Sequence, residues 1–142
     1  MIKAKSIIIK REPEQVFAFI VGLENASKIS PDVIRAQKIT KEVFGKGTKI
    51  EEIRKVGKKQ VKTILEVIKY KYPENYSLRS LEDGIEVTYH YIVKKHEGNT
   101  KLILSRKVKV EGIRKLLLPI VGFFMSKHEK SHLKRIQKLL DK

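Results

Sequence analysis

The sequence contains no cysteine, no tryptophan and no long run of apolar residues. Without cysteine, disulfides and thiolate chemistry are excluded, and the redox compartment stays open. The longest apolar segment, LLLPIVGFFM at 116–125, is well short of the about 20 residues that a membrane span requires. The N-terminal segment MIKAKSIIIKREPEQ has an apolar run of three residues, whereas a signal peptide needs roughly 7–15. We therefore expect a cytoplasmic protein without a membrane span.

Acidic residues are scarce relative to basic ones. The 142 residues include 32 Lys+Arg and 16 Asp+Glu, which gives a net charge of +16. This excess favours an anionic partner such as nucleic acid, a membrane surface or an acidic protein. The lysines are spread along the whole chain, so a generally basic protein without such a partner fits equally well. The length and the 41% of hydrophobic residues predict one globular domain over residues 1–142.

The period of the hydrophobic pattern changes along the chain. It predicts a strand at 2–10, two short helices within 11–30, and six strands between Val33 and Val110. After Gly112 the period becomes helical and predicts a long helix over about residues 113–141. This order indicates an α+β fold in which a seven-stranded antiparallel sheet packs against the C-terminal helix.

The turn sequences predict the register of the sheet. If Glu97-Gly98 is a two-residue loop, residues whose numbers sum to 195 face each other. One face of that hairpin is then almost wholly apolar and the other almost wholly polar, a contrast that a one-residue slip would destroy. Loops at Asp83-Gly84 and Gly57-Lys58 extend the apolar face across neighbouring strands, and place Tyr76 beside Tyr91.

Four polar residues interrupt the apolar face of the predicted sheet: Glu52, Arg54, Tyr89 and Arg106. An inward arginine is costly unless it is paired or hydrated. Two interpretations follow. Either an arginine caps the core through a salt bridge to Glu52, or it lines a cavity open to water and ligand.

The segment HEKSH at 128–132 matches the H-E-x-x-H pattern of zinc peptidases. On a helix, His128 and His132 would lie one turn apart, with Glu129 as the general base. However, zinc peptidases favour uncharged residues where this chain has Lys130, and Asp141 is the only acid after His132. We predict that the segment is no catalytic zinc site, and we expect no metal and no other cofactor.

Six loose motifs occur in a characteristic order. They are REPEQVFAFI after the first strand, Pro31 after the second short helix, GKGTKI opening a strand, YKYPENYSL at a strand turn, EGNTKLIL at a strand start, and LLLPIVGFF before a basic amphipathic helix. In this order they resemble the START-like, helix-grip superfamily (SRPBCC), which includes polyketide cyclases/dehydrases and coenzyme Q-binding proteins. The resemblance implies a seven-stranded curved sheet wrapping the long C-terminal helix, with an apolar ligand cavity between them. It implies no catalytic residues. Many relatives have a tryptophan where this chain has Ile29.

The leading hypothesis is a non-enzymatic protein that binds a hydrophobic or amphipathic small molecule, such as a lipid, isoprenoid or polyketide, under the C-terminal helix. Arg106, and with it Arg54, would meet a polar or anionic head group. The residues expected to contact the ligand are Arg54, Tyr76, Tyr89, Tyr91, Leu104, Arg106, Val121, Met125, Glu129 and His132.

Two alternatives remain open. One is a cyclase- or dehydratase-type enzyme, with Glu129 or Glu52 as general base and His132 as acid. The other is a basic adaptor that binds RNA or the ribosome through the lysine-rich sheet face and the hairpin RKVGKK at 54–59. The tyrosines of the predicted sheet point inward, so the sheet lacks exposed rings for base stacking. For the basic hairpin we expect weak, salt-sensitive contact with anionic membranes or RNA. No pattern specifies the oligomeric state.

Overall fold

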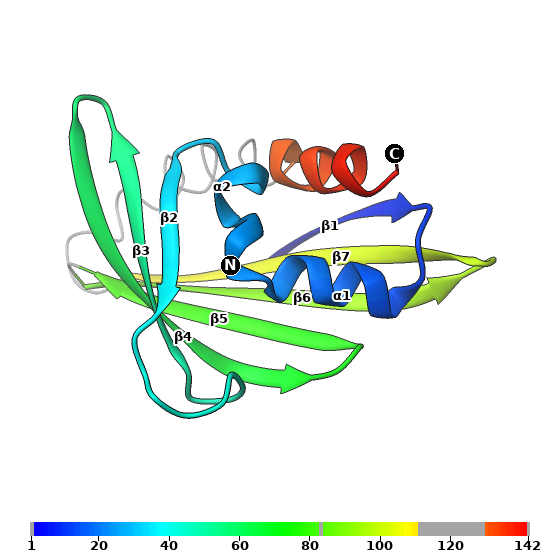
Figure 1. Ribbon diagram of the computed structural model, residues 1–142, viewed down its shortest axis with the longest axis horizontal. Helices are drawn as coiled ribbons and strands as arrows, with labels where there is room; N and C mark the ends of the chain where they lie inside the picture. Colours follow the sequence, from blue (N-terminus) through cyan, green and yellow to red (C-terminus); the bar gives the residue numbers. More distant parts are fainter. Residues whose placement is uncertain (1, 83, 111–129, 142) are drawn as a thin grey trace.

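A seven-stranded antiparallel sheet dominates the computed structural model, which describes residues 2–82, 84–110 and 130–141 (Figure 1). The strand order is β1-β7-β6-β5-β4-β3-β2, so only β1 lies out of sequence order, beside β7. The strands are β1 (Ile2–Ile9), β2 (Val33–Lys38), β3 (Lys49–Val56), β4 (Lys59–Lys71), β5 (Asn75–Glu82), β6 (Ile85–His96) and β7 (Asn99–Val110). The predicted α+β fold with a seven-stranded antiparallel sheet is therefore confirmed.

The predicted register of the hairpins is also confirmed. Each β6–β7 pair sums to 195, from Ile85 opposite Val110 to His96 opposite Asn99. The turn between them has positive φ at both Glu97 (46°) and Gly98 (83°), as a two-residue hairpin loop with the right twist requires. Tyr76 pairs with Tyr91, as predicted.

Three short helical segments follow β1, one more than the sequence predicts. They are α1 (Pro13–Val21), the 3-10 turn η1 (Leu23–Asn25) and α2 (Ala26–Ile29). Helix α1 begins with a capping box, in which the Glu12 backbone N–H donates to Gln15 Oε1 at 3.1 Å. Its buried face carries Val16 and Phe17, both 0% exposed. The 3-10 turn η1 lies at the junction of the two predicted helices, where the hydrophobic pattern gives no separate signal for three residues.

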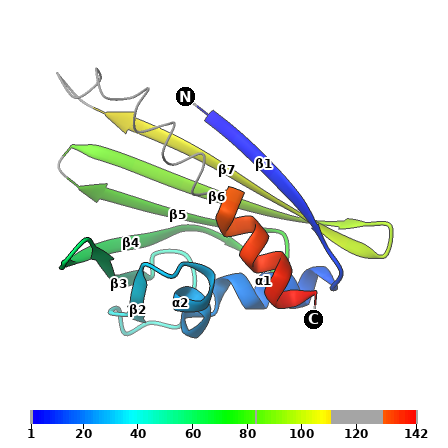
Figure 2. The same cartoon turned by 90° about the horizontal axis from the view of Figure 1, so that it is seen from above.

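The C-terminal helix is described over 130–140 and lies on the same side of the sheet as α1 and α2 (Figure 2). Its buried side chains Leu133 and Ile136 join the main core. The Gln137 side chain donates to the Ile8 carbonyl at 2.8 Å, which ties the helix to β1. The predicted start of this helix at residue 113 lies outside the described residues. No helix in the described ranges is long and apolar enough to cross a membrane.

The outer face of the central strands carries polar pairs, as the alternation predicts. Arg79 pairs with Glu66 at 2.6 Å across β5 and β4. Near them, the Ser77 hydroxyl and His90 Nδ1 are 2.6 Å apart. Burial, and the nearby charges of Lys69 and Lys107, lower the pKa of His90 below its ordinary value of 6.5.

We predict that His90 makes the protein less stable in mild acid. As the pH falls below about 6.5, the unfolded chain takes up a proton at this site that the folded protein resists, so the free energy of unfolding decreases. His90→Gln should therefore flatten the pH dependence of the urea midpoint between about pH 5 and 7. Equal slopes for wild type and His90→Gln would contradict the assignment.

Candidate functional site

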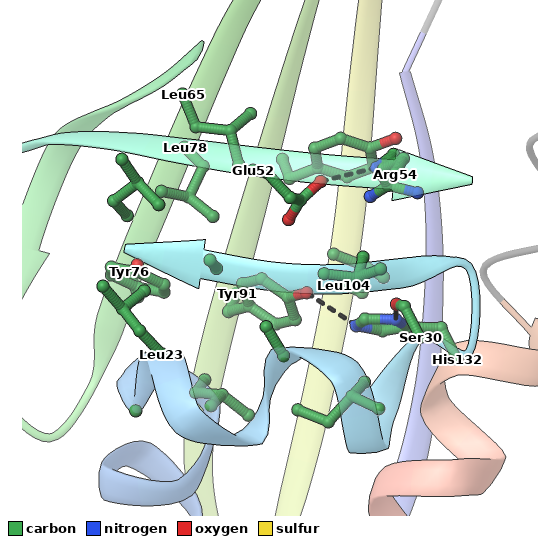
Figure 3. Close-up of a pocket in the computed structure, with 18 residues that line it drawn as sticks. Leu23, Ser30, Glu52, Arg54, Leu65, Tyr76, Leu78, Tyr91, Leu104 and His132 are labelled. Carbon is green, nitrogen blue, oxygen red and sulfur yellow. Dashed lines mark hydrogen bonds and ion pairs between the residues drawn. The ribbon is translucent and has the colours of Figure 1, made fainter. Parts of the chain in front are cut away.

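A cavity of about 120 Å³ lies between the inner face of the sheet, the η1–α2 segment and the start of the described C-terminal helix (Figure 3). The strand residues that line the cavity all point to the same side of the sheet. Their direction follows from the alternation of side chains along each strand and from the register between strands. Most of the wall is apolar. The apolar residues that line it are Ile20, Leu23, Ala26, Ile29, Val33, Ala36, Ile50, Leu65, Leu78 and Leu104.

Two tyrosines from neighbouring strands form a stacked pair in the wall. The rings of Tyr76 and Tyr91 lie 6.1 Å apart at an interplanar angle of 26°. Tyr76 also packs edge-on against Phe17 and Tyr70, which fixes its position. Burial, reinforced by neighbouring tyrosines, raises the pKa of both phenols far above the ordinary value. Both hydroxyls are therefore protonated at neutral pH and can donate hydrogen bonds.

A hydrogen-bonded chain of three side chains crosses one side of the cavity. The Tyr91 hydroxyl is 2.8 Å from His132 Nε2, and Ser30 Oγ is 3.2 Å from His132 Nδ1. If the phenol donates to Nε2, then Nδ1 carries the imidazole proton and donates it to Ser30. The chain joins β6, the C-terminal helix and the residue that follows α2, so it positions His132 from two sides.

An ion pair from β3 faces the same cavity. Arg54 Nε donates to Glu52 Oε1 at 2.5 Å. Glu52 is 7% exposed, whereas the Arg54 side chain is 35% exposed. Residues two apart share a face of a strand, which explains why both side chains point inward. The pair uses only Nε, so the terminal guanidinium nitrogens keep donors that can face a ligand.

Comparisons with solved structures give the same fold. Ara h 8.0201 superposes with a TM-score of 0.79 and 14% identity, covering 99% of this chain and 97% of that chain. TTHA0849 from Thermus thermophilus gives 0.77 and 16%, with 97% and 95% coverage. One half of the di-domain ARO/CYC BexL, from the BE-7585A biosynthetic pathway, gives 0.81 and 12%, covering 97% of this chain and 45% of BexL. No protein-family model and no curated protein matches the sequence.

The chain has the helix-grip fold. The resemblance read from the order of the sequence motifs is therefore confirmed for the fold. At 12–16% identity, these structures show the helix-grip architecture and nothing of the ligand or reaction.

The helix-grip arrangement brings six of the ten predicted contact residues together. Arg106 is not among the described residues that line the cavity. It is 1% exposed, on the same sheet face as the cavity residues, and pairs across the strands with Tyr89. Val121, Met125 and Glu129 lie outside the described residues. The six residues at the cavity are Arg54, Tyr76, Tyr89, Tyr91, Leu104 and His132.

Sequence reasoning missed the part of the wall that η1 and α2 supply. Leu23, Ala26 and Ile29 line the cavity, and Ser30 bonds to His132. Their three-residue spacing is a helical signal that marks one face. Arg54 pairs with Glu52, as the first interpretation of an inward arginine has it, and it also lines the cavity. That it meets a ligand there stays a prediction.

The zinc interpretation of HEKSH can be followed only at His132, because His128 and Glu129 lie outside the described residues. Both ring nitrogens of His132 lie within hydrogen-bond distance of Tyr91 or Ser30. Within residues 2–82, 84–110 and 130–141, no three His, Cys, Asp or Glu side chains gather as metal ligands would. That HEKSH is no catalytic zinc site stays a prediction.

We predict that Glu52 depends on Arg54 for its buried charge. Arg54→Met should lower the free energy of unfolding by about 1–3 kcal/mol, because a buried carboxylate loses its partner. Glu52→Gln/Arg54→Met should recover much of that loss, since an amide needs no counter-charge. Urea denaturation measures both effects.

Arg79→Met provides the matched control on the outer face. Its partners Glu66 and Glu86 have side chains that are 34% and 32% exposed, so water replaces the lost pairs at little cost. If the double variant at residues 52 and 54 is no more stable than Arg54→Met, the proposed coupling is wrong.

Proposed function

We propose that the protein binds an amphipathic small molecule in this cavity. Its apolar part would contact Tyr76, Tyr91 and Leu104, and its polar end would lie near Arg54 and His132. The observation that carries the proposal is the wall itself, which is mostly apolar but has an ion pair and a histidine-centred hydrogen-bond chain. Sites for small organic ligands typically combine these features.

The volume of the cavity restricts the part of the ligand that can enter it. At about 120 Å³ it is close to the about 150 Å³ of an engineered apolar cavity that accommodates benzene. One ring or a short branched chain therefore fits without rearrangement. A longer lipid, isoprenoid or polyketide would extend from the cavity or displace side chains at its edge, where Arg54 is partly exposed.

The polar end of the ligand is expected to carry oxygen acceptors. Arg54 supplies N–H donors, while His132 and Tyr91 can rearrange their mutual hydrogen bond to donate to a ligand. A carbonyl, hydroxyl or carboxylate oxygen fits this set. The head-group role that the sequence assigned first to Arg106 passes in this proposal to Arg54, because Arg54 lines the cavity.

A cyclase- or dehydratase-type enzyme is the second candidate, and one observation favours it. Glu52 and His132 line the same cavity, and His132 is held by Tyr91 as an acid–base group would need to be. Catalysis would require a bound substrate within hydrogen-bond reach of these groups.

The two candidates differ in what happens to the bound molecule. Native mass spectrometry distinguishes the two candidates when wild type and His132→Gln are both purified from the organism that naturally makes the protein. A carrier should contain the same ligand mass in both proteins. Different masses, with a precursor retained only by His132→Gln, would support the enzyme instead.

We predict that Leu104→Trp blocks the cavity. Leu104 is 1% exposed and lines the wall, so a larger ring at this position occupies the space meant for the ligand. Fluorescence titration with an anionic naphthyl probe should show saturable binding to wild type and at least roughly tenfold weaker binding to the variant.

Leu139→Trp provides the control, because Leu139 packs on the core from the C-terminal helix but does not line the cavity. It should bind the probe like wild type, and circular dichroism should show both variants folded. If wild type takes up no probe, or if both variants lose it equally, the proposed cavity site is refuted.

A further inference from the structure

The hairpin between β3 and β4 projects from one end of the sheet, opposite the end that bears the β6–β7 hairpin (Figure 1). Its tip is the turn at Gly57, where φ is +63°. Both strands near the tip have exposed side chains. None of these exposed side chains lines the cavity.

The hairpin carries charge of one sign. Residues 53–64 contain five basic residues and no acidic one. Arg54 is paired inside the cavity wall, and Lys62 lies 3.5 Å from Glu51. The other three, Lys55, Lys58 and Lys59, are exposed around the tip. Like charges this close repel one another, and a nearby anionic surface would offset this repulsion.

Val56 is exposed next to these lysines, and further apolar side chains are exposed along the hairpin and the neighbouring strand β2. Val56, next to the turn, is 59% exposed, and Val61 and Ile64 on β4 are 38% and 39% exposed. Ile34 on the adjacent edge strand β2 is 45% exposed. An apolar tip surrounded by lysines matches the interface of an anionic bilayer, where lysines meet lipid head groups and small apolar groups enter the acyl boundary.

We propose that the β3–β4 hairpin docks the protein on an anionic lipid surface, with Val56 entering the interface and Lys55, Lys58 and Lys59 contacting phosphate or carboxylate head groups. Arg54, which lines the cavity, is three residues from Gly57, or about 10 Å along the strand. Docking through the tip therefore holds the cavity close to the lipid.

The composition of the hairpin favours lipid over RNA. Among the described residues of the hairpin tip, 53–64, there is no aromatic side chain, and base stacking contributes much of the affinity of single-stranded RNA sites. The exposed valines and isoleucine would gain nothing from a phosphate backbone. A bilayer uses both the positive charge and the apolar groups.

Vesicle co-sedimentation tests the charge contribution. Wild-type protein should bind phosphatidylcholine vesicles that contain phosphatidylserine far more tightly than phosphatidylcholine alone, and added salt should weaken binding. Lys58→Gln/Lys59→Gln should weaken binding about 25-fold, since each lysine near an anionic surface contributes roughly a factor of five. Lys94→Gln/Lys95→Gln, at the opposite end of the sheet, lowers the net charge equally, from +16 to +14, and should change binding less than about threefold.

A second pair of variants tests the apolar contribution. Val56→Ser should weaken vesicle binding about three- to tenfold, whereas Val43→Ser should have no effect. Val43 is 90% exposed in the β2–β3 loop, away from the hairpin, so both substitutions remove an exposed valine. Because all these side chains lie on the surface, circular dichroism and the urea midpoint should stay at the wild-type values.

Three outcomes overturn docking through the hairpin. The first is equal binding to neutral and anionic vesicles. The second is an equal loss of vesicle binding in the Lys58/Lys59 and Lys94/Lys95 double variants. The third is displacement of the protein from vesicles by single-stranded RNA at an RNA concentration below that of the lipid. Leu104→Trp should bind vesicles like wild type. Loss of probe uptake in that variant with vesicle binding retained separates the docking surface from the cavity.

Discussion

The antiparallel register of the sheet is the constraint on which the site depends. Side chains alternate between the two faces of a strand, so a shift of one residue between β6 and β7 would turn Tyr91 outward while Leu104 stayed inside. The turn at Glu97-Gly98 prevents that shift through the backbone conformation of two residues. The same alternation brings Glu52 and Arg54 of β3 to the cavity.

Polar groups on the inner face are accommodated by pairing. Glu52 accepts a hydrogen bond from Arg54, and Tyr91 bonds to His132, which also lies next to Ser30. Pairing reduces the free-energy cost of removing these groups from water. Apolar side chains of similar volume would nevertheless stabilise a closed core at least as well. These pairs place hydrogen-bonding groups among the apolar residues that line the cavity.

The short helices and the C-terminal helix complete the site from the other side. Helix α2 ends next to Ser30, and residues 130–140 bring His132 to Tyr91. Their positions depend on contacts far apart in sequence, including the bond from Gln137 to the Ile8 carbonyl and from the Lys10 backbone N–H to Asp141. The helix that carries the histidine is thus held by the first strand of the sheet and the residue after it.

By itself, the sequence determined the α+β class, the strands, the hairpin registers and the inward positions of Glu52, Arg54, Tyr89, Tyr91 and Arg106. These follow from side-chain alternation and turn chemistry, which are local properties. Tertiary structure decided which inward arginine lines the cavity, that Ser30 meets His132, and that η1 and α2 form a wall. The contact between Ser30 and His132 joins residues 102 positions apart. Local periodicity shows which way a side chain points within its own element, but it cannot show which distant element that side chain will contact.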